Sequence, residues 1–424
     1  MLRQQALFSL AELRRTAEQF EAAGRILAKM DPGYWAALGY LNLASEYSRI
    51  DRDPARALVA LRVAEAMIGA DDDHARASDL TALIRLKAGV LSYQRSEYDK
   101  AIGFLKTINL DSYQAPQALY FHGLALAGQQ NYRAAMQSWH RAKKYPLAYP
   151  GVVDAWLGMG RGYDESGYLG QAGEAYQAAN SAFESERVSL RLLIRKVEAS
   201  GAYDALVRAA RHEDVEWFLA DSRTLTQPRV AYLLHYMEGA DAQVAVNRVA
   251  ELVSLDSALA HKEQDLAVYI AMLRQRQAKM TAGVGTSGRA SVEAGIAPLA
   301  QRLKVLKASA AANSGQTEQL TRIYQSLLDT KRRVGVFDRL AAKAPKQFAQ
   351  LLRRAVAAQS AVKDQRQVLS ELQGRAETIL TEEVIAFLKQ QHERITFALD
   401  RTEQQIAHLY EHLALTGLKR GEQK

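Results

Sequence analysis

The chain has no cysteine, only 8 prolines in 424 residues, and no long apolar run. The missing cysteine excludes disulfides, thiolate metal sites and cysteine nucleophiles. No stretch of about 18 or more uncharged apolar residues occurs, so no membrane span is expected. Residues 1–15 carry three arginines and no continuous apolar segment, so no signal peptide is expected. The compartment stays open, although the lack of cysteine favours a bacterial periplasmic or envelope location over the cytoplasm.

What the chain does contain is typical of a folded helical protein. Hydrophobic residues make up 48% and charged residues 24% of the sequence. Alanine, leucine, arginine, glutamine and glutamate, all good helix formers, are abundant. The length exceeds what one hydrophobic core usually serves, which indicates several structural units or a repeat array. We therefore expect an all-α fold with almost no strand.

Short patterns of small and large residues recur with a period in the mid-thirties. The best copy comprises Trp156, Met159, Gly160, Tyr163, Gly167, Leu169, Ala172, Tyr176 and Ala179. The copy before it comprises Leu119, His122, Gly123, Leu126, Tyr132, Ala135, Trp139 and Ala142. A weaker copy comprises Gly89, Tyr98, Ala101, Leu105 and Ile108. These spacings fit two antiparallel helices, in which the glycines and alanines allow close approach and the aromatic residues fill the space between them.

In these residues the sequence resembles the tetratricopeptide repeat family over about residues 35–185, with degenerate copies extending to 280. The resemblance implies a right-handed solenoid of helix pairs, whose concave wall is lined by the first helix of each pair. Upstream, residues 2–28 are either the second helix of a longer array or a degenerate capping pair. We expect three parts: a solenoid over 1–280 with its best repeats at 83–185, a glycine-rich linker over 281–298, and a basic helical or coiled-coil region over 299–424.

The last region carries a heptad-like seam, typical of a helix that packs on another helix. Its members are Ile385, Leu388, His392, Ile395, Leu399, Thr402, Ile406, Leu409 and Leu413. A second seam over 362–379 is out of register with it, so the two are either separate helices or one coil with a stutter near 380–385. The polar seam residues His392 and Thr402 favour an intramolecular helical bundle, and homo-oligomers through these helices remain possible.

The family resemblance implies a protein or peptide partner, bound from first-helix positions that packing does not use. These positions are Leu86, Val90, Tyr93, Gln94, Tyr120, Leu124, Ala127, Leu157, Arg161, Asp164 and Glu165. The mixture of apolar, aromatic and charged residues suits an amphipathic helix or an extended segment. We therefore predict a non-enzymatic scaffold or adaptor, with C-terminal helices for assembly or anchoring.

An alternative function rests on charge. All of the net charge of +8 arises from residues 299–424, and residues 299–354 hold 12 basic and 3 acidic side chains. The candidate basic patch is formed by Lys331, Arg332, Arg333, Lys343, Lys346, Arg353 and Arg354. Basic residues near Phe337 and Phe348 could bind an anionic membrane surface or a nucleic acid, whereas a solvated helical face is the ordinary interpretation.

Two short motifs resemble catalytic signatures without the context that those signatures need. Gly283, Gly285 and Gly288 spell G-x-G-x-x-G, but a polar helix and not a strand precedes them, which indicates a linker. His408, Glu411 and His412 spell H-x-x-E-H, but a catalytic zinc needs a third protein ligand and only 12 residues follow. Solvent-facing histidines are the better interpretation.

Two other groups of polar residues are expected to be structural. Residues 71–74 form an acidic cluster that could hold a cation, but such a run is more often a helix N-cap with first-turn acids. His122 occupies a repeat-core position and is expected to be packed. We predict no metal, no cofactor and no catalytic residue.

Overall fold

The computed structural model of the chain describes residues 2–51, 53–208, 228–281, 287–309 and 314–421. These residues form helices joined by turns, and no strand occurs among them. The predicted all-α fold is confirmed. None of these helices combines the length and the hydropathy that a membrane span requires.

The chain divides into two compact units. Unit 1 comprises Met1–Val246 and Glu377–Lys424, and unit 2 comprises Asn247–Ala376. The predicted boundary at the glycine-rich segment is therefore not where the compact units divide. The two units are described separately below.

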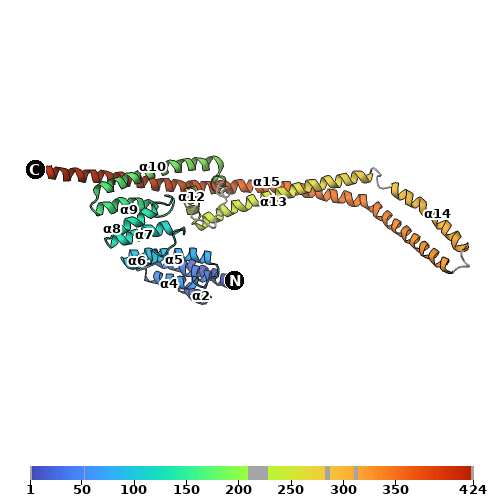
Figure 1. Cartoon of the computed structure of the whole chain (residues 1–424), viewed down its shortest axis with the longest axis horizontal. Helices are drawn as coiled ribbons and strands as arrows, with labels where there is room; N and C mark the ends of the chain where they lie inside the picture. Colours follow the sequence, from blue (N-terminus) through green and yellow to red (C-terminus); the bar gives the residue numbers. More distant parts are fainter. Residues whose placement is uncertain (1, 52, 209–227, 282–286, 310–313, 422–424) are drawn as a thin grey trace. The chain divides into compact units, whose positions relative to one another are not determined.

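Unit 1 is built from consecutive helix pairs. They are α1 (Leu2–Thr16) with α2 (Phe20–Leu27), α3 (Tyr34–Ile50) with α4 (Ala55–Ile68), α5 (His74–Gln94) with α6 (Tyr98–Leu105), α7 (Ala115–Gly128) with α8 (Tyr132–Ala142), and α9 (Val152–Glu165) with α10 (Leu169–Ser200). Figure 1 shows these pairs stacked one after another, and the first helices α3, α5, α7 and α9 contact their neighbours along the stack. The architecture is an all-α solenoid of helix pairs.

A constant glycine contact fixes the register of the three best pairs. Each repeat glycine lies against a large side chain sixteen residues later, on the second helix of the same pair. The contacts are Gly89 with Leu105, Gly123 with Trp139, and Gly160 with Tyr176. A Cβ atom at any of these glycines would overlap the facing side chain, so the helices can approach this closely only because glycine stands there.

The acidic cluster at 71–74 acts as a helix cap, as predicted. Asp73 is the N-cap of α5 and accepts a hydrogen bond from the backbone N–H of Arg76 at 3.1 Å. Asp71 accepts from the Arg76 guanidinium at 2.8 Å and from the backbone N–H of Tyr34 at 2.8 Å. Burial opposes ionisation of Asp71, but these hydrogen bonds outweigh it and the pKa of Asp71 is lowered. The cluster therefore joins two neighbouring pairs.

Beyond the repeats, unit 1 is completed by parts distant in sequence. The π-helical turn η1 (Tyr203–Arg208) and α12 (Pro228–Tyr236) follow α10, and the last stretch of α15 (Ser314–Gly421) belongs to the same unit. Its residues 377–421, here called the C-terminal segment, lie beside α10 (Figure 1). Asn180 of α10 donates to the Thr402 hydroxyl at 3.3 Å, and Tyr176 packs with Leu409.

The C-terminal segment also caps η1. The backbone N–H of Ala202 donates to the Thr381 hydroxyl at 3.0 Å, and that of Tyr203 donates to the Glu377 carboxylate at 2.9 Å. These side chains satisfy N–H groups that the first turn of a helix leaves without an internal partner. The seam predicted from sequence is thus used within the molecule, and its members Leu388, Ile395 and Leu399 are buried.

Unit 2 contains α14 (Ser287–Ser309), most of α13 (Ala240–Thr281) and the preceding part of α15. Ile270 and Leu273 of α13 are buried against Ala355 of α15, with Phe348 and Leu352 beside them. Nearby, the guanidinium of Arg366 donates to both Asp256 and Glu263 of α13, each at 2.9 Å. Two carboxylates two turns apart on α13 therefore hold one arginine of α15.

The structure differs from two sequence-based expectations and decides a third point that the sequence left open. Residues 240–281, expected to form degenerate repeats, make one long helix because no glycine or proline interrupts them. The expected linker 281–298 is helical from Ser287, and Pro298 lies inside α14; residues 282–286, with Gly283 and Gly285, lie outside the described residues. The two seams, for which separate helices or one coil were the alternatives, lie in one continuous helix, α15.

A half-buried carboxyl group, that of Glu186, gives unit 1 a testable pH dependence. The hydroxyl of Tyr232 donates to Glu186 at 2.5 Å, and burial raises the pKa of Glu186 despite this hydrogen bond. The folded state then holds the proton above the ordinary carboxyl pKa, so stability falls as pH rises through that window. Glu186→Gln should therefore stabilise unit 1 near neutral pH and have a smaller effect in acid.

Thermal unfolding followed by circular dichroism at about pH 4 and about pH 7.5 measures this difference. Glu198→Gln, an exposed position on the same helix α10, serves as the matched control. Equal gains from Glu186→Gln at both pH values would contradict the assignment of a raised pKa.

Candidate functional site

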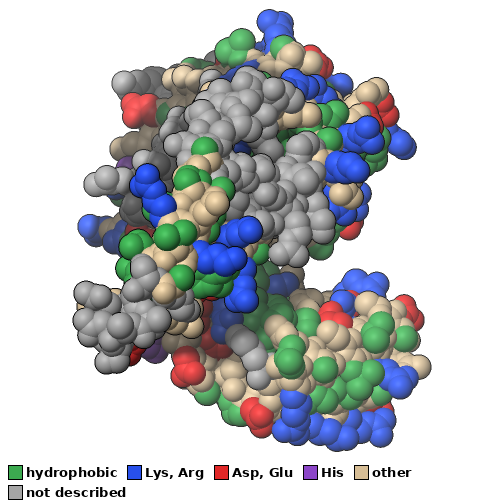
Figure 2. All heavy atoms as spheres, turned by 90° about the vertical axis from the view of Figure 1, so that its right-hand side faces the viewer, with side chains coloured by type: hydrophobic (Ala, Val, Ile, Leu, Met, Phe, Trp, Pro, Cys, Tyr) green, Lys and Arg blue, Asp and Glu red, His purple; other side chains and the backbone are tan. Residues whose placement is uncertain are grey.

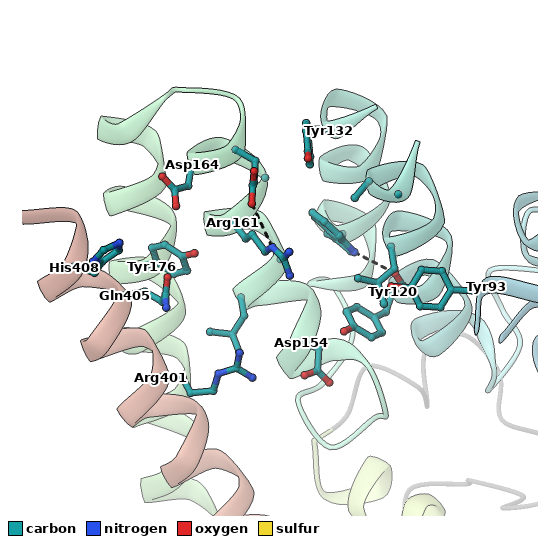
Figure 3. Close-up of a pocket in the computed structure, with 18 residues that line it drawn as sticks. Tyr93, Tyr120, Tyr132, Asp154, Arg161, Asp164, Tyr176, Arg401, Gln405 and His408 are labelled. Atoms are coloured by element: carbon teal, nitrogen blue, oxygen red, sulfur yellow. Dashed lines mark hydrogen bonds and ion pairs between the residues drawn. The ribbon is translucent and has the colours of Figure 1, made fainter. Parts of the chain in front are cut away.

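Two cavities lie along the first helices of the repeats. The first, here called the aromatic cavity, has a volume of about 570 Å³. Its lining is formed by Tyr93, Tyr120, Leu124, Ala127, Gly128, Tyr132, Trp139, Asp154, Leu157, Gly158, Arg161, Gly162, Asp164, Glu165, Tyr176, Arg401, Gln405 and His408. Figure 3 shows side chains from α5, α7, α9, α10 and α15 around this space.

The second, here called the aliphatic cavity, has a volume of about 720 Å³. Its lining is formed by Ala44, Ser45, Ser48, Leu61, Leu83, Leu86, Lys87, Val90, Leu91, Gln94, Tyr113, Gln114, Gln117 and Glu238. The first-helix positions predicted from sequence divide between the two cavities. Leu86, Val90 and Gln94 line the aliphatic cavity, and all the others line the aromatic one. Leu86 is only 4% exposed and packs in a hydrophobic core with Ala101 and Leu105, so the expectation that packing does not use this position is wrong.

Trp139 of α8 forms part of the floor of the aromatic cavity. Its Nε1–H donates to the backbone carbonyl of Tyr120 at 3.1 Å, which joins α8 to α7. Gly158 of α9 lies directly on the indole, and a Cβ atom there would meet the ring at 2.9 Å. The indole of Trp139 therefore contacts both α7 and α9, and its hydrogen bond fixes the backbone at Tyr120.

Charged groups of both signs face the aromatic cavity. Arg161 lies 3.8 Å from Glu165, and Asp154 lies 3.7 Å from Arg394. Arg401 has no carboxylate partner within the part of the chain that the structure describes. Figure 3 shows the Arg161 side chain above that of Arg401, both to the left of Tyr120 in this view. A ligand carboxylate could therefore pair with Arg401 without displacing an existing ion pair.

Tyr120 and Tyr176 of this cavity keep their protons at neutral pH. Burial raises the pKa of Tyr120 to about 12, and nearby Asp154 adds to the shift while Arg401 and Arg161 oppose it. Burial likewise raises the pKa of Tyr176 to about 12. Both phenols are therefore neutral hydrogen-bonding groups with large apolar rings, which suits recognition.

Sequence reasoning missed Arg401, Gln405 and His408, which bring the C-terminal segment to the aromatic cavity. The heptad seam indicated that this helix packs on another helix, but nothing in the spacing says which one. His408 is exposed, as expected for a solvent-facing histidine, and it also lines the cavity. No group of three or more potential metal ligands occurs among the described residues.

His122 is half-buried between two repeats. Its Nδ1 lies 3.1 Å from the Ser138 hydroxyl, which itself donates to the Leu119 carbonyl at 2.9 Å. Burial lowers the pKa of His122, and nearby Arg141 and Lys106 add to this effect. His122 also lines a further cavity of about 380 Å³ outside the predicted groove. A neutral, hydrogen-bonded imidazole here agrees with the predicted packing role.

The predicted basic patch lies on α15 within unit 2. Its described side chains, Lys331, Arg332, Arg333, Lys346, Arg353 and Arg354, are all exposed, and the side chain of Lys343 lies outside the described residues. Arg332 lies 3.8 Å from Asp329. On the face that Figure 2 shows, Lys and Arg side chains occur in small groups separated by hydrophobic and acidic ones.

Comparisons with known proteins give a limited result. No protein-family model matches the chain, and no curated protein matches it. A crystal structure of MamA is 20% identical, with a TM-score of 0.33, and the match covers 42% of this chain and 95% of that one. A structure of MamA from MSR-1 is 17% identical, with a TM-score of 0.31, and the match covers 44% of this chain and 99% of that one. A structure of MamA from AMB-1 is 18% identical, with a TM-score of 0.31, and the match covers 42% of this chain and 91% of that one. At these values the comparisons assign no function.

Proposed function

We propose that this protein is a non-enzymatic adaptor that binds a segment of a partner protein along the first helices of its repeat array. The observation that carries the proposal is that the first-helix positions named from the repeat pattern line two neighbouring cavities. Rings of Tyr93 and Tyr120, aliphatic Leu124 and Leu157, and charges of both signs form the wall. This combination suits an amphipathic helix or an extended peptide.

The C-terminal segment completes this groove. It contributes Arg401, Gln405 and His408 to the aromatic cavity, and its buried seam holds it against α10. The partner would thus contact residues distant in sequence, so both the repeats and residues 377–421 are needed for binding.

Site-specific photo-crosslinking tests the proposal. We would replace Tyr120 by p-benzoylphenylalanine in the full chain, irradiate cells that produce it, and identify covalent adducts by mass spectrometry. Tyr168 provides a matched control, because it is a tyrosine of the same array that is 57% exposed and lines neither cavity. We expect one protein to be crosslinked from position 120 and not from position 168. Equal crosslinking from both positions would rule out the groove as the binding site.

The alternative function, binding of an anionic surface by the basic patch, is supported by the exposure of its arginines and lysines. Ionic strength separates the two functions, because phosphate contacts weaken steeply with salt whereas groove packing changes little. Charge reversal at Arg353 and Arg354 should leave crosslinking from position 120 unchanged if the groove is the site.

A further inference from the structure

The aliphatic cavity contains a lysine whose charge is not balanced by a neighbouring acid. Lys87 of α5 is half-buried, and its Nζ donates to the Ser45 hydroxyl at 3.1 Å. The Ser45 hydroxyl itself donates a hydrogen bond to the Leu41 carbonyl at 3.0 Å, so it can only accept from the lysine. An ammonium group has three donors, and the described residues supply a partner for one of them.

Aliphatic side chains form part of the wall around Lys87. Leu61, Leu83, Leu86, Val90 and Leu91 line the cavity beside it. Burial lowers the pKa of Lys87, as expected for a cation removed from water without an anion nearby. A carboxylate placed in the cavity would compensate this loss of hydration.

The other charged residue of the lining is already engaged. Glu238 accepts a hydrogen bond from the Tyr113 hydroxyl, and its Oε1 lies 3.1 Å from His235 Nδ1. No ion pair joins it to Lys87 within 4.0 Å in the described part of unit 1. Lys87 is therefore the cationic group available to a ligand here.

The rim of the cavity favours a polypeptide over a small amphiphile. Gln94, Gln114 and Gln117 line it, and their side chains make no hydrogen bond among the described residues. Each carboxamide offers both a donor and an acceptor, the combination that a peptide backbone needs. Gln94 follows Tyr93, which lines the aromatic cavity, so the two cavities meet at the end of α5.

We propose that the aliphatic cavity receives a Leu, Ile or Val side chain of the bound partner segment, and that Lys87 pairs with an Asp or Glu side chain next to it in the partner sequence. This inference rests on the proposed function, because it specifies the sequence that the groove accepts. Lys87 is thus a specificity-determining residue, selecting an acidic residue at one position of an otherwise apolar segment.

The test is selection of peptides from a phage-displayed random dodecamer library on the full-length chain. We expect the parent protein to enrich peptides in which Asp or Glu adjoins Leu, Ile or Val. Lys87→Met should keep the aliphatic preference and lose the acidic one, and Lys87→Glu should select Lys or Arg instead. Lys196→Met, at an exposed position of α10, is the matched control and should select the same peptides as the parent.

Fluorescence anisotropy with the most enriched peptide then measures the ion pair. Replacing the peptide's acidic residue by its amide should weaken binding to the parent about tenfold and binding to Lys87→Met less than about twofold. Circular dichroism establishes that each variant is folded as the parent is.

The outcomes separate this inference from the proposed function. Peptides enriched without an acidic preference, or a preference that persists in Lys87→Met, would overturn the inference and leave the adaptor function standing. Sodium decanoate, a small amphiphile with a carboxylate, tests the other possible ligand class. If it binds only when Lys87 is present while the enriched peptides lack acidic residues, the inference is overturned and the adaptor function stands. If the parent enriches no peptide at all, both the inference and the proposed function fail.

Discussion

Replacing Trp139 by alanine should lower the free energy of unfolding of the repeat array by about 3–5 kcal/mol. The indole is 2% exposed and fills the space between Gly123 of α7 and Gly158 of α9. Its Nε1–H also donates to the Tyr120 carbonyl. Removing the ring leaves a cavity between three helices whose close approach depends on it, so the surroundings cannot readily collapse around an alanine.

Urea unfolding followed by far-UV circular dichroism measures this loss. Because repeat arrays can unfold in parts, the midpoint of the transition that includes α7–α9 is the quantity to compare. Trp156→Ala is the matched control, since Trp156 is only half-buried and has Lys143 Nζ stacked 3.7 Å from its ring centroid. A loss for Trp139→Ala no larger than that for Trp156→Ala would contradict the role assigned to the indole.

Replacing Leu388 by alanine should weaken partner binding although Leu388 lines neither cavity. Its side chain is 0% exposed and belongs to the seam that packs the C-terminal segment against the rest of unit 1. Its truncation should lower the free energy of unfolding by about 2–5 kcal/mol. The local opening of this segment would then become more frequent. Arg401, Gln405 and His408 would spend less time at the aromatic cavity, and crosslinking from position 120 should fall.

Hydrogen exchange gives an independent measure of the same opening. Backbone amides of residues 380–400 should exchange faster in Leu388→Ala, whereas those of α3 and α4 should not change. Phe397→Ala, on the same helix but with a side chain that is 64% exposed, is the matched control and should alter neither exchange nor crosslinking. If both variants reduce crosslinking equally, the contribution of the seam to the groove is refuted.

The repeat half could be predicted from sequence because its signals are local. A glycine and a large side chain sixteen residues later, such as Gly123 and Trp139, recur in three helix pairs. The sequence therefore indicated both the length of the repeat and which residues face each other within a pair. Asp73 could likewise be assigned as a cap from its position before a helix. By contrast, α14 begins within the segment expected to be a linker, because Pro298 and the glycines before it are ordinary helix breakers, and the tertiary context that overrides them leaves no local pattern.

The predicted site was incomplete for a similar reason. First-helix positions follow from the repeat register, so Tyr120 and Arg161 could be named. Arg401 joins the same cavity only because residues 377–421 pack against α10, a contact between segments more than two hundred residues apart. Lys87 was missed because it faces a cavity between pairs, at a position that the family pattern does not assign to ligand contact.

The order in which the chain is made has a consequence for unit 1. Its repeats are synthesised first, all of unit 2 follows, and only then do residues 377–421 leave the ribosome. Until that moment α10 lacks the helix that covers it, and the first-helix wall exists without Arg401, Gln405 and His408. A nascent chain can therefore fold its repeats early, but it acquires the complete groove only after the translation of an entire separate unit.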